Sequence, residues 1–364
     1  MIGRRDFIGR VGKAAVGLGL ASATSEACAL KASSQREPKN WTWAHGGGDV
    51  SEDEWRRRFA RIRAAGIHGV LVSGGDTELL SRAAHAEDLE FHRWIWVLNR
   101  SGDTWVREYH PEWFTIARTG QSSLENPPYV GYYKWICPTR EPVREYLSGI
   151  VDELAASPNI DGVHLDYIRH SDVILPAGLW SKYDLVQDRE YPEFDFCYCD
   201  VCRERFQRET GNDPLELPDP TLDVAWREFR WDTVTELVSQ LAERAHAHEK
   251  PITAAVFPTP SVARKLVRQA WEQWPLDAFF PMIYHEFYEK DVPWIGTATS
   301  EGVAALPAGI PLYSGLFLPN LSPDELAESV SHASSAGASG VSLFEMGGLT
   351  NEHLAQLAES SGGD

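Results

Sequence analysis

Positive charge is scarce in this sequence. Its 364 residues include 34 Lys and Arg but 53 Asp and Glu, which gives a formal net charge of −19 at pH 7. Proteins bind nucleic acids and anionic membranes largely through Lys and Arg, so this balance argues against both as partners. It also argues against a heavily sulfated or uronate-rich polymer as a ligand, unless a local basic patch exists.

Long apolar runs are also missing. The apolar stretch at 14–23 is too short to span a bilayer. It follows the twin arginine Arg4-Arg5 and precedes small residues, which is the pattern of a twin-arginine (Tat) export signal. We therefore predict a Tat signal peptide over 1–30 and a polar linker over 31–39. The Tat machinery is then a partner, the chain has no membrane span, and its location is periplasmic or extracellular.

A glycine-rich phosphate loop with the dinucleotide-binding spacing is absent. The run Gly46-Gly47-Gly48 lacks that spacing, which argues against the runner-up fold, a doubly wound open sheet. From Asn40 onward, short β-rich runs alternate with helical stretches such as 141–156, 223–249, 261–273 and 323–336. The expected strands are 40–45, 69–75, 93–99, 160–170, 251–258, 277–285, 310–319 and 340–348. Eight such repeats predict an α/β fold, a (β/α)₈ TIM barrel over 40–358.

Two connections in this barrel are long. They follow the third and fourth strands, at about 100–140 and 170–222. Both leave the C-terminal face of the barrel, where barrels of this kind build their active sites. Long connections inside a compact domain are usually functional, so we expect these two to shape a site.

The fourth strand carries the best catalytic candidate. In GVHLDYIRH the alternation of a strand places His164 and Asp166 on the barrel side. The opposite side, toward the helices, is expected to carry Val163, Leu165 and Tyr167. Asp166 ends the strand at the mouth of the barrel, where a carboxylate can act on a ligand. The alternative is a buried carboxylate that pins a loop through Arg169.

Other polar and aromatic residues end strands at the same face. Cleavage of a glycosidic bond normally needs two carboxyl groups, and the candidates for the second are Glu345, Glu286 and Asp76. For each of them a solvated loop acid is the alternative. Aromatic rings stack on sugars, and polar groups bind their hydroxyls. The residues expected to bind substrate are His164, Arg169, Tyr284, His285, Asp76, Trp43, His45, Trp96, Asn99 and Trp135.

Cysteine is sparse but concentrated. Cys197, Cys199 and Cys202 form a C-x-C-x₂-C group, and Cys137 lies upstream. The fifth, Cys28, falls in the predicted signal, where a lipid anchor is the alternative to removal. Neighbours this close do not easily bridge each other, so four thiolates around a structural Zn²⁺ explain the spacing best. Such a site would join the two long connections. One disulfide with two free thiols is the alternative.

These motifs resemble two known groups. HLDYIRH, CYCDVCRERF, WREFRWDTVTELV and FPMIYHEFY together resemble the family-10-like glycoside hydrolases, across most of 40–350. In that group the Asp of the LDYIR motif is the catalytic suspect, here Asp166. The four cysteines are similar to the zinc cluster of family 42 β-galactosidases. That family places an Asn-Glu pair on the fourth strand, whereas this chain has Leu165-Asp166, so a shared zinc site does not imply a shared mechanism.

The resemblance implies an exported glycoside hydrolase. Its substrate would be an oligo- or polysaccharide, cleaved by carboxylate acid/base or nucleophilic catalysis. Two alternatives stay open. One is a barrel that binds carbohydrate without cleaving it. The other is a metal-assisted hydrolase, which would need His or carboxylate ligands and an open coordination position, whereas the available cluster is all cysteine.

Overall fold

A computed structural model describes residues 38–361 of the chain. The predicted export signal, including Cys28, and most of the predicted linker lie outside the described residues. Within the described part, no helix is both long enough and apolar enough to cross a membrane.

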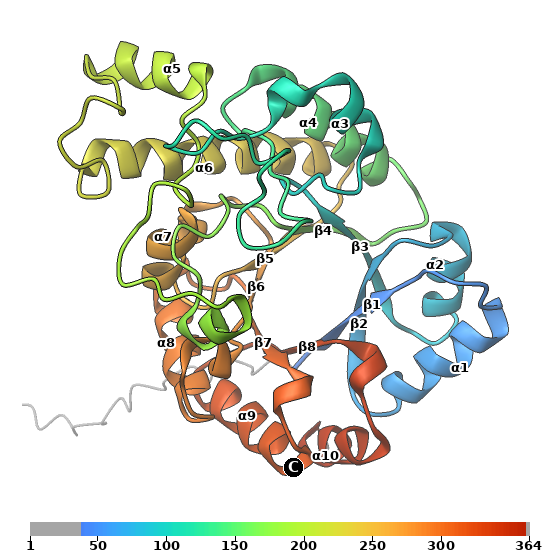
Figure 1. The fold of residues 1–364 in the computed structure, drawn as a ribbon. Coiled ribbons are helices and arrows are strands. Elements are labelled where there is room, and N and C mark those ends of the chain that lie inside the picture. Colours follow the sequence, from blue (N-terminus) through green and yellow to red (C-terminus); the bar gives the residue numbers. More distant parts are fainter. Residues whose placement is uncertain (1–37, 362–364) are drawn as a thin grey trace, which may run out of the picture. The chain divides into compact units, whose positions relative to one another are not determined.

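Eight parallel strands form the predicted barrel (Figure 1). Their order is β6-β5-β4-β3-β2-β1-β8-β7, and parallel bridges from Phe279 to Leu312 and from Met282 to Gly315 join the two ends. All pairings between strands are parallel, so every strand ends at the same mouth. The strands are β1 (Asn40–His45), β2 (Ile67–Ser73), β3 (Glu90–Trp96), β4 (Gly162–Asp166), β5 (Ile252–Val256), β6 (Ala278–Pro281), β7 (Tyr313–Phe317) and β8 (Gly340–Phe344).

Helices surround the barrel. They are α1 (Glu52–Arg63), α2 (Thr77–His85), α3 (Thr104–Tyr109), α4 (Glu141–Ala155), α5 (Asp200–Thr210), α6 (Val224–Ala247), α7 (Pro260–Val267), α8 (Trp294–Ala305), α9 (Pro323–Ser335) and α10 (Asn351–Ser361). Side-chain caps fix where several of them begin. Ser51 caps α1, and Ser322 with Glu325 forms a full capping box on α9. Most of the helices pack an apolar face against the strands, whereas the buried residues of α5 belong to a separate cluster next to α6.

The helix expected over 261–273 is shorter than predicted. Helix α7 ends at Val267, because Arg268 adopts a left-handed conformation with φ of 55°. A separate 3-10 turn follows at Trp271–Gln273. The Arg268 side chain is buried and pairs with Glu190 from the loop after β4, so a tertiary contact overrides the local helical pattern.

The two long connections lie side by side above the mouth (Figure 1). The one after β3 contains α3, and the one after β4 contains α5 and the 3-10 helix η2 (Ala177–Tyr183). A short antiparallel bridge between Ala117 and Phe196 pairs them directly. A further 3-10 helix, η4 (His285–Tyr288), follows β6 and contacts η2. These segments therefore bring residues distant in sequence to one edge of the mouth.

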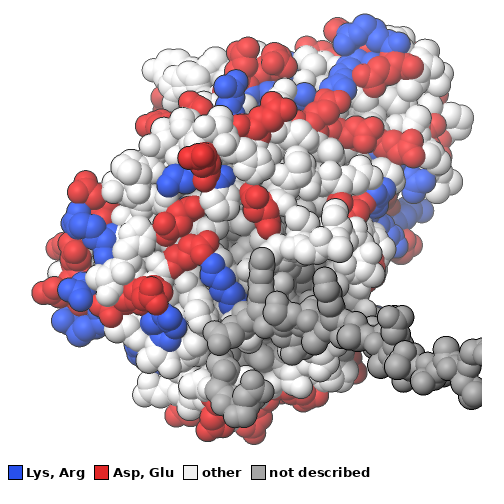
Figure 2. All heavy atoms as spheres, turned by 180° about the vertical axis from the view of Figure 1, so that it is seen from behind, with Lys and Arg blue, Asp and Glu red and all other residues white. Residues whose placement is uncertain are grey.

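The surface seen from behind carries charge of both signs. Figure 2 shows acidic side chains spread over this face, with Lys and Arg scattered between them. This distribution agrees with the excess of acidic residues in the sequence and gives no extended basic field in that view.

Candidate active site

A pocket opens where the strands end. Its volume is about 430 Å³, at the small end of the range for ligand pockets. The lining is mostly aromatic, with a few charged groups. The residues that line it are His45, Trp94, Trp96, Tyr132, Tyr133, Asp166, Tyr167, Arg169, Asp172, Leu175, Pro176, Leu179, Lys182, Tyr183, Phe257, Met282, Tyr284, Phe287, Tyr288, Phe317 and Phe344.

Asp166 lies at the base of this pocket, as the last residue of β4. The backbone amide of Tyr167 donates to its Oδ1 at 2.6 Å, and Nε1 of Trp94 donates to its Oδ2 at 3.1 Å. Burial raises the pKa of the Asp166 carboxyl to about 6, against the opposing effect of these hydrogen bonds and of Arg169. A carboxyl in this state exchanges a proton in the mildly acidic range.

Tyr167 lies in the pocket, so the prediction that it faces the helices was wrong. The strand ends at Asp166, and Tyr167 takes a left-handed conformation with φ of 50°. The alternation of a strand stops there. The Tyr167 ring lies 4.6 Å from the ring of Trp96 and 5.5 Å from that of Trp135, measured between centroids.

Arg169 and Asp172 form a buried ion pair in the wall of the pocket. Nη1 of Arg169 donates to Oδ2 of Asp172 at 2.9 Å. The guanidinium lies over the rings of Trp135 and Phe257, at 4.9 and 4.8 Å. Burial raises the pKa of Asp172, and its proximity to Arg169 opposes that effect. The pinning partner of Arg169 is therefore Asp172, which leaves Asp166 without a salt bridge of its own.

Glu345 connects to Asp166 through two intervening side chains. It follows β8, and its Oε2 lies 3.2 Å from Nε2 of His45. The His45 ring lies 5.0 Å from the ring of Trp94, and Trp94 donates to Asp166. Nδ1 of His45 lies 2.9 Å from Oγ of Ser73, at the end of β2. The ends of β8, β1, β3 and β4 thus form one continuous arc of contacts.

The residues predicted after β6 divide between the pocket and the surface. Tyr284 lines the pocket, where burial first and the Asp166 charge second raise the pKa of its phenol. Glu286 is exposed on η4 and lies outside the lining, and His285 is buried beneath η4. Of the carboxylates expected to act together with Asp166, Glu345 therefore belongs to the arc of contacts that reaches Asp166, and Glu286 does not.

Several predicted binding residues lie outside the pocket. His164 and Trp43 are buried inside the barrel, where Nδ1 of His164 bonds Oγ1 of Thr253 at 2.8 Å. Burial lowers the pKa of His164 well below its usual value, so the ring is neutral. The other three predicted binding residues make contacts within the protein instead. Asp76 caps α2, Asn99 accepts from the amide of Ser101, and Trp135 packs under Arg169.

Other pocket residues did not stand out in the sequence. Trp94 had a readable signal, because it lies two residues before Trp96 on the same face of β3. Phe257, Phe317 and Phe344 come from the ends of β5, β7 and β8. The other aromatic and charged groups come from the long connections and from η4, and they are Tyr132, Tyr133, Asp172, Lys182, Tyr183, Phe287 and Tyr288. Connections of this kind have no periodicity from which the direction of a side chain can be read.

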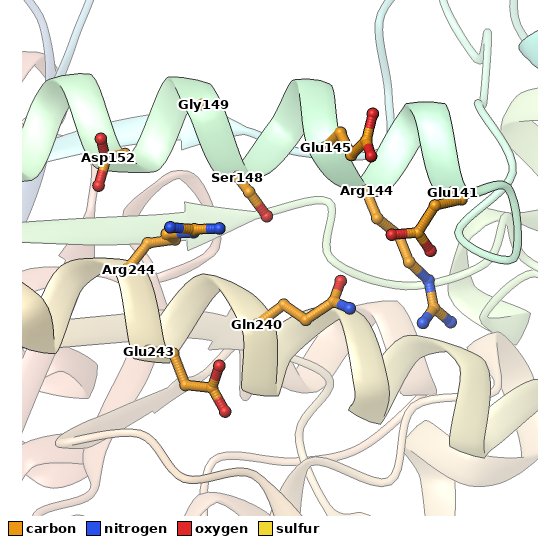
Figure 3. Close-up of a pocket in the computed structure, with 9 residues that line it drawn as sticks. All are labelled: Glu141, Arg144, Glu145, Ser148, Gly149, Asp152, Gln240, Glu243 and Arg244. Carbon is orange, nitrogen blue, oxygen red and sulfur yellow. The ribbon is translucent and has the colours of Figure 1, made fainter.

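A second hollow lies on the outside of the barrel, between α4 and α6 (Figure 3). Its volume is about 410 Å³. Ser148 and Gly149 in its lining are small and leave space between the two helices. Most of the other residues that line it are charged, among them Arg144, Glu243 and Arg244. It is remote from the strand ends and from Asp166, so the pocket at the mouth remains the candidate active site.

Four cysteines meet between the two long connections. The Sγ atoms of Cys137, Cys197, Cys199 and Cys202 all lie within 4.8 Å of one another, and all four residues are buried and free of disulfides. Two of the sulfur pairs are 3.4 and 3.7 Å apart. Tetrahedral Zn–S bonds of about 2.3 Å place sulfurs roughly 3.8 Å apart, so the donor set fits such a metal. The predicted grouping of the four cysteines is confirmed.

Comparison with solved structures identifies relatives in fold. The PgaB (BpsB) glycoside hydrolase domain from Bordetella bronchiseptica has a TM-score of 0.62 and 10% identity, and covers 89% of this chain and 97% of its own. The β-amylase catalytic domain from Paenibacillus polymyxa has a TM-score of 0.61 and 9% identity, with 87% and 94% covered. A β-galactosidase from Rahnella sp. R3 has a TM-score of 0.61 and 13% identity, with 90% of this chain and 56% of that chain covered.

These likenesses confirm the TIM barrel, in the form found in several glycoside hydrolases. At 9–13% identity they establish the fold alone. No protein-family model matches the sequence, and no curated protein matches it. Membership of the family-10-like group and kinship with the family 42 zinc site therefore stay predictions.

Proposed function

We propose that this protein is a glycoside hydrolase that cleaves an oligo- or polysaccharide at the mouth of its barrel. The observation that carries the proposal is Asp166, a carboxyl whose pKa burial raises to about 6, at the base of an aromatic pocket. Aromatic faces stack on sugar rings, and a carboxyl that keeps its proton in mild acid can protonate a leaving oxygen. The barrel that this chain shares with glycoside hydrolases supports the same conclusion.

Asp166 acts in this scheme as the general acid. Trp94 and the amide of Tyr167 hold its two oxygens in place, so the protonated oxygen can face the glycosidic oxygen of a bound sugar. The second carboxyl, base or nucleophile, is Glu345, which lies outside the pocket lining but contacts His45, a residue that lines the pocket. His45 lies between Glu345 and the pocket and orients that carboxylate. Trp96 and Tyr132 supply stacking faces, and Tyr284 a hydroxyl near Asp166.

Release of new reducing ends tests the proposal. The full chain is incubated with aryl glycosides of common hexoses, pentoses and N-acetylhexosamines, and with bacterial and algal polysaccharides. We expect release from at least one glycan. If no glycan in the panel is cleaved but one binds, the carbohydrate-binding alternative replaces hydrolysis. If a metal chelator abolishes cleavage while the fold and the metal content of the four-cysteine cluster are unchanged, the metal-assisted alternative gains support.

The dependence of cleavage on pH tests the role of Asp166. A general acid must be protonated before the reaction, and the pKa of Asp166 is raised to about 6. We therefore expect kcat/KM to fall as the pH rises through about 6, roughly tenfold per pH unit beyond it. An Asp166 nucleophile would give the opposite limb, with activity lost as the pH falls through 6. The measurement is kcat/KM between pH 4 and 9 on the glycan that is cleaved.

We further propose that the four cysteines bind Zn²⁺ as a closed structural site. All four ligands are thiols, which leaves no open position for substrate, and the cluster lies apart from the pocket lining. A bound zinc ion would hold the connection after β3 against the one after β4. Export through the Tat pathway is part of the same proposal, because that pathway carries folded cargo in which the metal can already be bound.

A further inference from the structure

The connections around the mouth differ strongly in length. The one after β1 runs only from residue 46 to 51, and the one after β2 from residue 74 to 76. The connections that run from β3 to α4 and from β4 to α5 and α6 hold the long loops described above. The connections after β7, at 318–322, and after β8, at 345–350, are also short. The mouth is therefore low on the side from β7 through β8 and β1 to β2, and high on the side of β3 to β6.

The high side begins with contacts between the two long connections. The hydroxyl of Tyr129 donates to the carbonyl of Asp172 at 2.9 Å. Its ring stacks on Phe194 with centroids 4.4 Å apart and meets the edge of Tyr183 in η2 at 6.2 Å. Gln187 donates to the Tyr129 hydroxyl at 2.8 Å. Tyr129 thus anchors the connection after β3 to the one after β4.

The high side continues from η2 to η4, which lies beyond β6. At Gly178 in η2, an added Cβ would lie 2.0 Å from the carbonyl oxygen of Glu286 in η4. Only glycine permits this approach of the two backbones. On the inner side of the same contact, Leu179 and Phe287 line the pocket. The contacts from Tyr129 through η2 to η4 therefore form a continuous wall, which we call the β3–β6 wall.

A glycan lying across the barrel would have to pass through the β3–β6 wall. Asp166 lies at the foot of this wall, because it ends β4. Sugar units can extend from Asp166 only toward the low side, where His45 lines the pocket. From this geometry we propose that the enzyme acts on chain ends: the pocket takes the terminal sugar of a glycan, and the rest of the chain leaves over β1 and β2. This inference rests on the proposed function.

The products of the parent protein test the inference. The probes are oligosaccharides of the sugars in the aryl glycoside panel, labelled with a fluorophore at the reducing end and sampled from the earliest times. We expect the labelled chain to shorten in steps of one constant size if the pocket takes the unlabelled end, or a single small labelled product of constant size if it takes the labelled end. A spread of intermediate sizes at the earliest times would overturn action on chain ends and leave hydrolysis standing. A lack of any cleavage would instead overturn the proposed function, and the inference with it.

A wall variant adds a second readout. Gly178→Leu places a side chain against the Glu286 carbonyl, so η2 must move away from η4 and the wall opens. We expect the ratio of internal to terminal cleavage to rise roughly tenfold, which corresponds to about 1.4 kcal/mol. Gly102→Leu is the matched control, because a Cβ at Gly102 meets nothing within 4 Å. An unchanged ratio in a Gly178→Leu protein that folds normally by circular dichroism would count against the wall as the determinant.

Discussion

Asp166→Asn is expected to lower kcat/KM for the cleaved glycan by about 10²–10⁴-fold, the usual contribution of a general acid. Asn has nearly the same shape as Asp, and its one side-chain oxygen still accepts from the amide of Tyr167, while its amide nitrogen takes the place of the oxygen that accepts from Trp94. It has no proton of suitable pKa to give to a leaving oxygen. Asp88→Asn is the matched control, since Asp88 is an exposed acid just before β3, at the end of the barrel opposite the mouth. Equal rates for Asp166→Asn and the parent would remove Asp166 from the chemistry.

The same variant is expected to be more stable than the parent at neutral pH. The pKa of Asp166 is raised to about 6 in the folded protein, from its ordinary value of 3.8. Above pH 6 the folded chain holds an ionised carboxylate in a buried site, which costs about 3 kcal/mol. Below the unfolded pKa the group is neutral in both states, and the cost disappears. Asn is neutral at every pH, so the gain should be present above pH 6 and lost on acidification.

Thermal unfolding at pH 7.5 and pH 3.5 measures this difference. The melting temperature of Asp166→Asn, relative to that of the parent, should be higher at pH 7.5 than at pH 3.5, because the loss of the hydrogen bond from Trp94 costs the same at both. An equal difference at the two pH values would mean that the ionised carboxylate is not destabilising and that Asp166 serves to hold the loop. The rate and the stability of one variant therefore distinguish a catalytic from a structural carboxyl.

The strand pattern predicted much of the fold and the location of Asp166. Near-continuous apolar runs that alternate with helical stretches indicate parallel strands covered on both faces, and all eight expected strands are present in the barrel. Asp166 was predictable because a strand places alternate residues on one face and the barrel brings all strand ends together. The same rule failed one residue later at Tyr167, whose left-handed backbone ends the alternation.

The walls of the pocket could not be predicted in the same way. Their positions depend on contacts between segments far apart in sequence, such as Tyr129 with Phe194 and Gly178 with Glu286. For Asp76 the sequence predicted too much, because its position after a strand suggested a contact with a ligand. The structure uses its carboxylate to accept from the amides of Glu78 and Leu79 at the start of α2. Cap residues and site residues occupy similar places in a barrel, and only their contacts separate them.

The cysteine cluster was predictable from spacing alone, because metal ligands must converge on one point. Its surroundings explain why its loss should be costly. The cysteines belong to a small apolar cluster, separate from the core of the barrel, with Phe196, Phe206 and Trp226 among its members. Next to it, the buried pair of Asp195 and Arg230 joins the connection after β4 to α6. This region has little apolar area of its own with which to hold two long connections.

Cys202→Ser is therefore expected to lower the free energy of unfolding by more than about 4 kcal/mol, in the range seen when a structural metal is lost. A serine hydroxyl is a poor zinc ligand, and removing one of four leaves three buried thiols around an incomplete site. The purified parent should contain one equivalent of zinc by elemental analysis, and the variant much less. Proteolysis of the variant should begin within 100–140 and 170–222, the segments that the metal would join.

Cys28→Ser is the matched control for this substitution, because Cys28 lies outside the four-cysteine group. It should leave both the zinc content and the unfolding transition unchanged. A metal-free parent with four titratable thiols, as stable as Cys202→Ser, would contradict the zinc site. In that case the close approach of the sulfurs would reflect packing alone. If the metal is present, its removal should also reduce cleavage, because the metal would secure the two connections whose contacts begin the β3–β6 wall beside Asp166.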